Sequence, residues 1–146
     1  MKTLITAIVL ALTPLTAQAY VAEDQQETYE LWTGIVNETM TCTFYGEEIS
    51  RDHLEELVTS VGEKKANEFL ELIDFNVSQS TYVYTTVVID KESGLNKLYQ
   101  KRFHNHYYDS MFDIMEISAE LVERDLNELG MKKSVEKYMN KCSKYA

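Results

Sequence analysis

The sequence has little of what many folds and membrane segments require. Its 146 residues include one proline, five glycines and two cysteines. So few turn-forming residues favour long uninterrupted elements over a sheet of many short strands. Beyond the first twenty residues there is no apolar run long enough to cross a bilayer, so we predict no membrane insertion. The length suits a single domain, which we place at residues 20–146.

Sequence signatures of catalysis are also missing. There is no G-x-S-x-G, no glycine-rich phosphate loop, no H-E-x-x-H and no C-x-x-C. Carboxylate pairs are abundant, but at helical spacing such pairs are typical of a solvated surface rather than of a glycosidase cleft. They are Glu47/Glu48, Glu55/Glu56, Glu120/Glu123 and Asp125/Glu128. We therefore predict a protein that is not an enzyme and needs no cofactor.

The first nineteen residues have the three parts of a secretory signal peptide. Lys2 supplies the positive charge, residues 4–15 form an apolar core of twelve residues, and Ala17 and Ala19 give a small-x-small cleavage pattern. We predict cleavage before Tyr20 and a mature protein that is periplasmic or secreted.

Basic residues are scarce. The whole chain has 14 Lys+Arg against 24 Asp+Glu, and losing the leader removes one lysine and no acid, so the mature charge is −11. A chain of this charge is repelled by phosphate backbones, which predicts no nucleic-acid partner. Its negative charge attracts cationic proteins and raises the rate at which they encounter the chain.

Cys42 and Cys142 are predicted to form a disulfide, because an exported protein meets an oxidising compartment. The bond would join the first helix of the mature domain to the last. Two buried free thiols are the alternative.

Apolar residues recur at intervals of three and four along most of the chain, which predicts a small helical bundle of four or five helices. Gly46 is interpreted as the end of the first helix, Ser50 as an N-cap and Gly130 as a helix C-terminus. The most regular stripe lies after His106, and we expect it to face the core of the bundle. Its members are Tyr108, Met111, Phe112, Met115, Ala119, Val122, Leu126 and Leu129, and Ile114 and Leu121 widen it.

Residues 81–103 are ambiguous. Residues 81–89 are rich in β-branched and aromatic side chains, and 90–94 resemble a turn, which together suit a β-hairpin. An isolated hairpin is marginally stable, however, and Ser78 or Ser80 offers a cap for a short helix carrying Tyr82, Thr86 and Ile89. We favour the helix and keep an α+β fold with a hairpin at about 81–103 as the alternative.

His104 and His106 suggest a metal site only if they lie in a strand, where both side chains project to one side. In a helix they lie about 200° apart. We therefore predict no metal site and keep these two histidines as the alternative.

Tyrosine suits interfaces because one end is apolar and the other polar. The tentative binding residues are Glu47, Glu48, Tyr107, Tyr108 and Asp109. We hypothesise an exported binding protein, such as a periplasmic inhibitor or immunity protein, that engages a cationic protein through an acidic, tyrosine-containing surface. The alternative is a periplasmic small-ligand or metal carrier with a cavity between Trp32, Tyr82 and Phe112, or a stress chaperone.

Overall fold

The computed structural model describes residues 25–144, and within this range the chain forms five α-helices and no strand. An all-α helical bundle is thus confirmed. The predicted leader and its cleavage site lie outside the described residues. In chain order the elements are α2 (Gln26–Asp52), α3 (Leu54–Val61), α4 (Glu63–Tyr84), the π-helical turn η2 (Thr85–Ile89), α5 (Lys97–Glu128) and α6 (Met131–Cys142).

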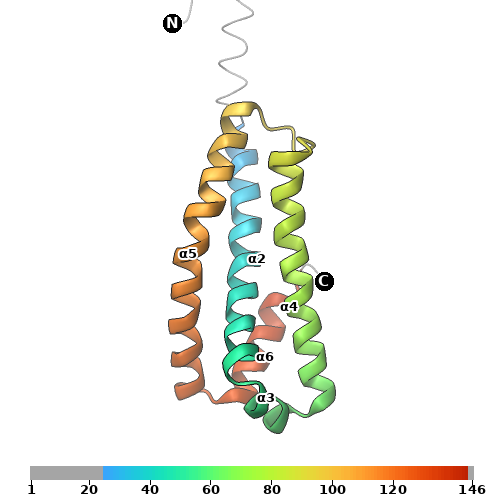
Figure 1. Cartoon of the computed structure of the whole chain (residues 1–146), viewed down its shortest axis with the longest axis vertical. Coiled ribbons are helices and arrows are strands. Elements are labelled where there is room, and N and C mark those ends of the chain that lie inside the picture. The colour runs from blue at the N-terminus through green and yellow to red at the C-terminus, as the bar shows by residue number, and fades with distance from the viewer. Residues whose placement is uncertain (1–24, 145–146) are drawn as a thin grey trace, which may run out of the picture.

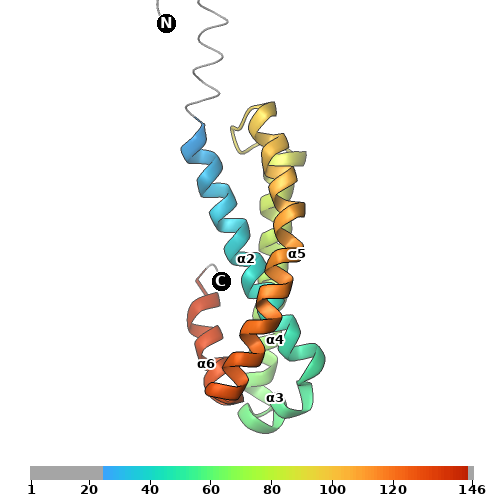
Figure 2. The same ribbon diagram turned by 90° about the vertical axis from the view of Figure 1, so that its left-hand side faces the viewer.

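Helix α2 is the centre of the bundle. It packs along both α4 and α5, which lie on either side of it (Figure 1). The short α6 runs beside the lower half of α2 only (Figure 2), and the upper half of α2 packs on α4 and α5 through Val36 and Met40. The upper half of the bundle is therefore built from α2, α4 and α5, and the lower half adds α6 and the short α3. Among residues 25–144, no helix is both long and apolar enough to span a bilayer.

The core consists of two apolar clusters, one in each half. The lower cluster is centred on Phe69, Leu57 and Val135, and brings together α2, α3, α4, α5 and α6. The upper cluster is centred on Phe103, Val87 and Val36. Burying such side chains supplies most of the stability of a bundle, at roughly 1.5–3 kcal/mol for each large one.

Two sequence interpretations of α2 are wrong. Gly46 does not end the helix, because α2 continues to Asp52. The glycine marks a close approach instead: a Cβ at this position would collide with the side chain of Ile73 in α4. Ser50 is not an N-cap, since it lies within α2 and the chain bends only at His53. A second break follows at Gly62, whose φ of 87° suits glycine.

The hairpin at 81–103 is wrong, and burial explains why the residues on both sides of the connection at 90–96 are helical. Val83 and Val87 are buried at a spacing of four residues, and so are Leu95, Tyr99 and Phe103. Packing against the upper cluster thus overrides the β-propensity of the segment. Of the three residues that the predicted short helix carries, Thr86 is buried, whereas Tyr82 and Ile89 are exposed.

Helix α5 begins earlier than the sequence analysis predicts, at Lys97. Asn96 caps it, because its Oδ1 accepts a hydrogen bond from the backbone N–H of Tyr99 at 3.1 Å. The predicted stop at Gly130 is confirmed, since α5 ends at Glu128 and Gly130 has a φ of 82°.

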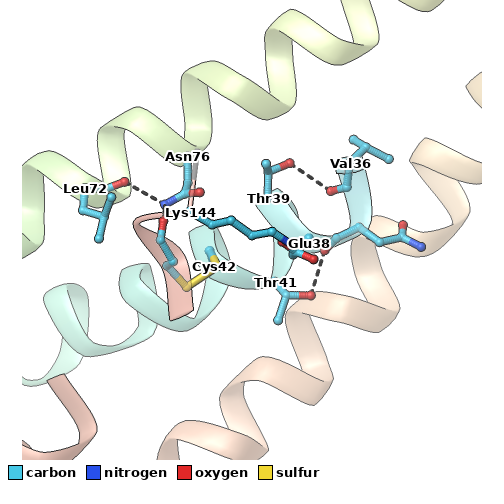
Figure 3. The surroundings of a disulfide bond; sticks show 10 residues. Val36, Glu38, Thr39, Thr41, Cys42, Leu72, Asn76 and Lys144 are labelled. Atoms are coloured by element: carbon cyan, nitrogen blue, oxygen red, sulfur yellow. Dashed lines mark hydrogen bonds and ion pairs between the residues drawn. A yellow bond between two sulfur atoms is a disulfide. The ribbon is translucent and has the colours of Figure 1, made fainter. Parts of the chain in front are cut away.

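The predicted pairing of Cys42 with Cys142 is confirmed. Their sulfur atoms are at bonding distance, and the bond joins α2 to the last turn of α6 (Figure 3). Two further interactions hold this end of α6. The Asn76 side chain donates to the carbonyl of Cys142 at 3.3 Å, and Lys144 pairs with Glu38 at 3.3 Å. The C-terminal helix is therefore fixed to both α2 and α4.

Candidate functional site

The outer side of α5 carries an apolar stripe that the bundle leaves largely uncovered. Its members follow one another at intervals of four and three residues, which keeps them on one side of the helix. We call this stripe the α5 seam. It consists of Tyr108, Phe112, Met115 and Ala119; Val122 and Leu126 continue the same spacing but pack in the lower cluster. Tyr108 is 47% exposed, Phe112 66% and Met115 42%, and Ala119 is half-buried. Large apolar side chains with this exposure are characteristic of an interaction surface.

The prediction that the regular stripe of α5 faces the core is wrong for Tyr108, Phe112, Met115 and Leu129, which are exposed. It is right for Val122, which is buried, and for Met111 and Leu126, which pack against the core clusters. The face of α5 that meets the other helices is centred beside the stripe, on Phe103, Tyr107, Ile114, Ser118, Leu121 and Asp125. Two of its members are polar, which interrupts the apolar pattern of the buried face in the sequence.

A row of carboxylates runs along the exposed flank of the seam. We call it the acidic row, and its members are Asp109, Asp113, Glu116, Glu120 and Glu123, all exposed. Between Phe103 and Glu123 the chain has no lysine or arginine. The side chains of this stretch therefore present negative charge alone beside the apolar seam, a combination suited to a cationic partner.

An aromatic cluster fixes the upper end of the seam. The hydroxyl of Tyr84 on α4 lies 2.7 Å from His104 Nδ1, and its ring packs 4.6 Å from that of Tyr107 and 6.0 Å from that of Tyr108, centroid to centroid. Burial and the neighbouring Tyr108 raise the pKa of Tyr84. Because Tyr108 packs against three rings, its conformation is restricted before any partner binds, which lowers the entropy cost of binding.

At its lower end the seam meets an open hollow of about 410 Å³ between α5 and the end of α2. From α5 the hollow is lined by Ala119, Val122, Leu126 and Asn127 and by two members of the acidic row, Glu120 and Glu123; from the α2 end it is lined by Glu48, Asp52 and His53. Arg51 pairs with Glu48 at 2.7 Å and with Asp52 at 3.2 Å, so two of the four carboxylates have a cationic neighbour.

The structure distributes the five tentative binding residues over different surroundings. Tyr108 and Asp109 lie in the exposed part of the α5 surface. Tyr107 is half-buried and packs against the upper cluster, so it supports the surface from beneath. Glu48 lines the hollow, and Glu47 is half-buried on α2 without lining it.

The remaining sequence candidates lose their geometric basis. Both histidines of the metal alternative lie in α5 and point to different helices: His104 contacts Tyr84 of α4, and His106 Nε2 lies 2.9 Å from Asn37 Oδ1 of α2. Within residues 25–144, no three His, Cys, Asp or Glu side chains are placed so that they could hold a metal ion together. The ligand cavity predicted between Trp32, Tyr82 and Phe112 is not enclosed, because the Tyr82 and Phe112 side chains are both exposed.

Among residues 25–144, Asp125 is the one strongly buried carboxylate, and it serves the lower core. It is 3% exposed, and its Oδ2 accepts hydrogen bonds from the Tyr45 hydroxyl and from Lys137 Nζ, each at 2.8 Å. Burial opposes its ionisation, but the bonds from Lys137 and Tyr45 outweigh burial and hold the pKa of Asp125 below its usual value. The same burial, together with Asp125, raises the pKa of Tyr45. These groups fasten α2, α5 and α6 together.

No protein-family model, curated protein or solved structure matches this chain.

Sequence reasoning missed Phe112 and Met115 as surface residues and the acidic row as a unit. The signal for both was present. The 4-3 spacing of the apolar residues is that of a coiled-coil seam, and acids follow it on one flank.

Proposed function

We propose that this chain is an exported, non-catalytic binding protein that engages a cationic protein through the surface of α5. The class that fits best is an inhibitor or immunity protein acting in the periplasm. One observation carries the proposal: exposed Tyr108, Phe112 and Met115 lie beside an unbroken row of five carboxylates. The predicted leader and the disulfide support export, because disulfides persist in oxidising compartments.

The surface has the two components that a specific and fast association needs. The apolar side chains supply the area that becomes buried, and aromatic residues are frequent among those that contribute most to affinity. The acidic row steers a positively charged partner and excludes acidic ones. The fixed position of Tyr108 limits the entropy lost on binding. The mature charge of −11 extends the same attraction over the whole molecule.

The test is retention of a partner from an envelope extract of the native host at low salt, with identification by mass spectrometry. The variant replaces three acids of the row: Asp109→Asn, Glu116→Gln and Glu123→Gln. Its matched control neutralises three exposed acids elsewhere, Glu30→Gln, Glu55→Gln and Glu63→Gln, so that both variants change the net charge equally.

We expect one stoichiometric basic protein on the wild-type chain and on the control, released by high salt because exposed charges are then screened. Retention by the row variant falls at least about tenfold, the effect of losing about 1.4 kcal/mol. Equal loss from both variants would indicate a general charge effect and contradict the assignment to α5. Absence of any retained basic protein at low salt would overturn the proposed function.

A further inference from the structure

We infer that the α5 seam is one half of an unfilled two-helix coiled coil, and that its occupant is a cationic amphipathic helix of the partner. This inference rests on the proposed function and names the element by which the partner is recognised. It is carried by the register of the exposed residues on α5, which combines an uncovered apolar seam with one acidic flank.

The seam fills successive core positions of a heptad repeat. Tyr108 and Met115 are seven residues apart, and so are Phe112 and Ala119, which form the alternating pair. From Tyr108 to Ala119 the seam runs about 17 Å at about 1.5 Å per residue. A helix of about three turns therefore covers it, and helices recognise such stripes by inserting their own apolar side chains between the exposed ones.

The two flanks of the seam differ, and this difference determines the charge of the partner. On one flank Met111 is half-buried and Ser118 and Asp125 are buried against the bundle. On the other flank the corresponding heptad positions are Asp109, Glu116 and Glu123, all exposed. Flanking positions set partner choice in coiled coils through charge. A helix that lies on the seam therefore places one of its own flanks against three carboxylates, which requires lysine or arginine there.

The size of the seam residues gives the surface a direction. Phe112 and Met115 are large and protrude at the upper end, whereas Ala119 is small and adjoins the hollow at the lower end. A partner helix can place small residues opposite Phe112 and a long side chain opposite Ala119. A lysine or arginine suits the second position, because its aliphatic stem contacts Ala119 and Leu126 while its charge reaches Glu120 and Glu123.

A second copy of this chain is a poor occupant of the same surface. The bundle blocks one flank of the seam, so a second copy can approach only over the open, acidic flank. Equivalent flanks meet in a twofold-symmetric pair whose α5 helices run antiparallel. That arrangement places the acidic row of one copy against the acidic row of the other. Like charges opposed in this way disfavour association.

The probe is a synthetic peptide of three heptads with leucine at the two core positions and lysine at the two flanking positions. Its lysines keep it from pairing with itself, so helicity measured by circular dichroism reports binding. A second peptide has the same composition but a scrambled order that destroys the 4-3 spacing of the leucines. Binding of each peptide to the mature protein is measured by fluorescence anisotropy.

The variant combines Phe112→Ser with Met115→Ser, and the matched control combines Ile117→Ser with Leu31→Ser. Ile117 lies on the same helix, on the side away from the seam, and both control residues are exposed, so the two variants remove similar apolar area without touching the core. Circular dichroism of each variant alone verifies that the bundle is intact.

We expect the heptad peptide to become helical on binding and to bind at least tenfold more tightly than the scrambled peptide. The seam variant binds it at least tenfold more weakly, and the control variant binds it like the wild type.

Equal binding of the two peptides, or equal binding by the two variants, would overturn the inference. If a partner is retained through the acidic row and binds the Phe112→Ser/Met115→Ser variant as tightly as the wild type, the inference about the seam is overturned. The proposed function would still hold in that case. Failure to retain any basic protein would overturn the proposed function itself.

Discussion

Replacing both Cys42 and Cys142 with alanine is expected to lower the free energy of unfolding by about 2–5 kcal/mol. The two residues are 100 positions apart, so the bond removes much of the freedom of the unfolded chain. For a loop of this size, loop-closure entropy gives about 4.7 kcal/mol. Their Cα atoms are 5.8 Å apart, within the range that suits a disulfide, so the native fold accommodates the bond.

The loss should centre on α6, which has only twelve residues and whose isolated helix would be marginal. Urea unfolding of the oxidised wild type and the double variant measures the difference. Hydrogen exchange locates it, with amides of α6 expected to lose protection first. The reduced wild type serves as control, because it should unfold like the variant. A difference below about 1 kcal/mol would contradict the role assigned to the bond.

Replacing Asp125 with asparagine is expected to cost about 1–3 kcal/mol at neutral pH, because the buried Tyr45 hydroxyl and the Lys137 ammonium lose their shared charged acceptor. Lys137 is half exposed and regains water, which keeps the cost below that of breaking a fully buried pair. Asp113→Asn, an exposed acid on the same helix, is the matched control and should change stability by less than about 0.5 kcal/mol.

The dependence on pH follows from the direction of the Asp125 shift. Its pKa is lower in the folded protein than the ordinary value of 3.8, so its ionisation favours folding. This contribution is present above pH 3.8 and is lost as the pH falls through the folded pKa. The stability difference between wild type and Asp125→Asn should therefore shrink in acid. A difference that stays constant from neutral pH to well below 3.8 would contradict the role of the charge.

The sequence predicted the elements of the fold whose signals are local. Helical periodicity predicted the bundle, Gly130 predicted the end of α5, and the two cysteines predicted the disulfide. Gly46 shows where local signals mislead: it resembles a helix end, but its role is to let α2 approach Ile73 of α4. That requirement exists only in the packed structure.

The candidate site was predicted only in part, because periodicity identifies a stripe without telling which partner covers it. Helix α5 has two stripes. The one that faces the core includes Ser118 and Asp125, whose polarity interrupts its pattern, so the more regular seam was interpreted as the buried face. Tyr108 and Asp109 were identified from composition alone. Phe112 and Met115 were assigned to the core, and only the three-dimensional structure shows that nothing within residues 25–144 covers them.

The most direct test of the central claim is hydroxyl-radical footprinting of the α5 surface, with and without the cationic partner bound. Oxidation rates are compared for Phe112 and Met115 on the seam and for Ile117 on the opposite side of the same helix, all three exposed in the free protein. If the partner binds this surface, Phe112 and Met115 become several-fold slower to oxidise and Ile117 does not change. Unchanged rates at Phe112 and Met115 in a saturated complex would contradict the account.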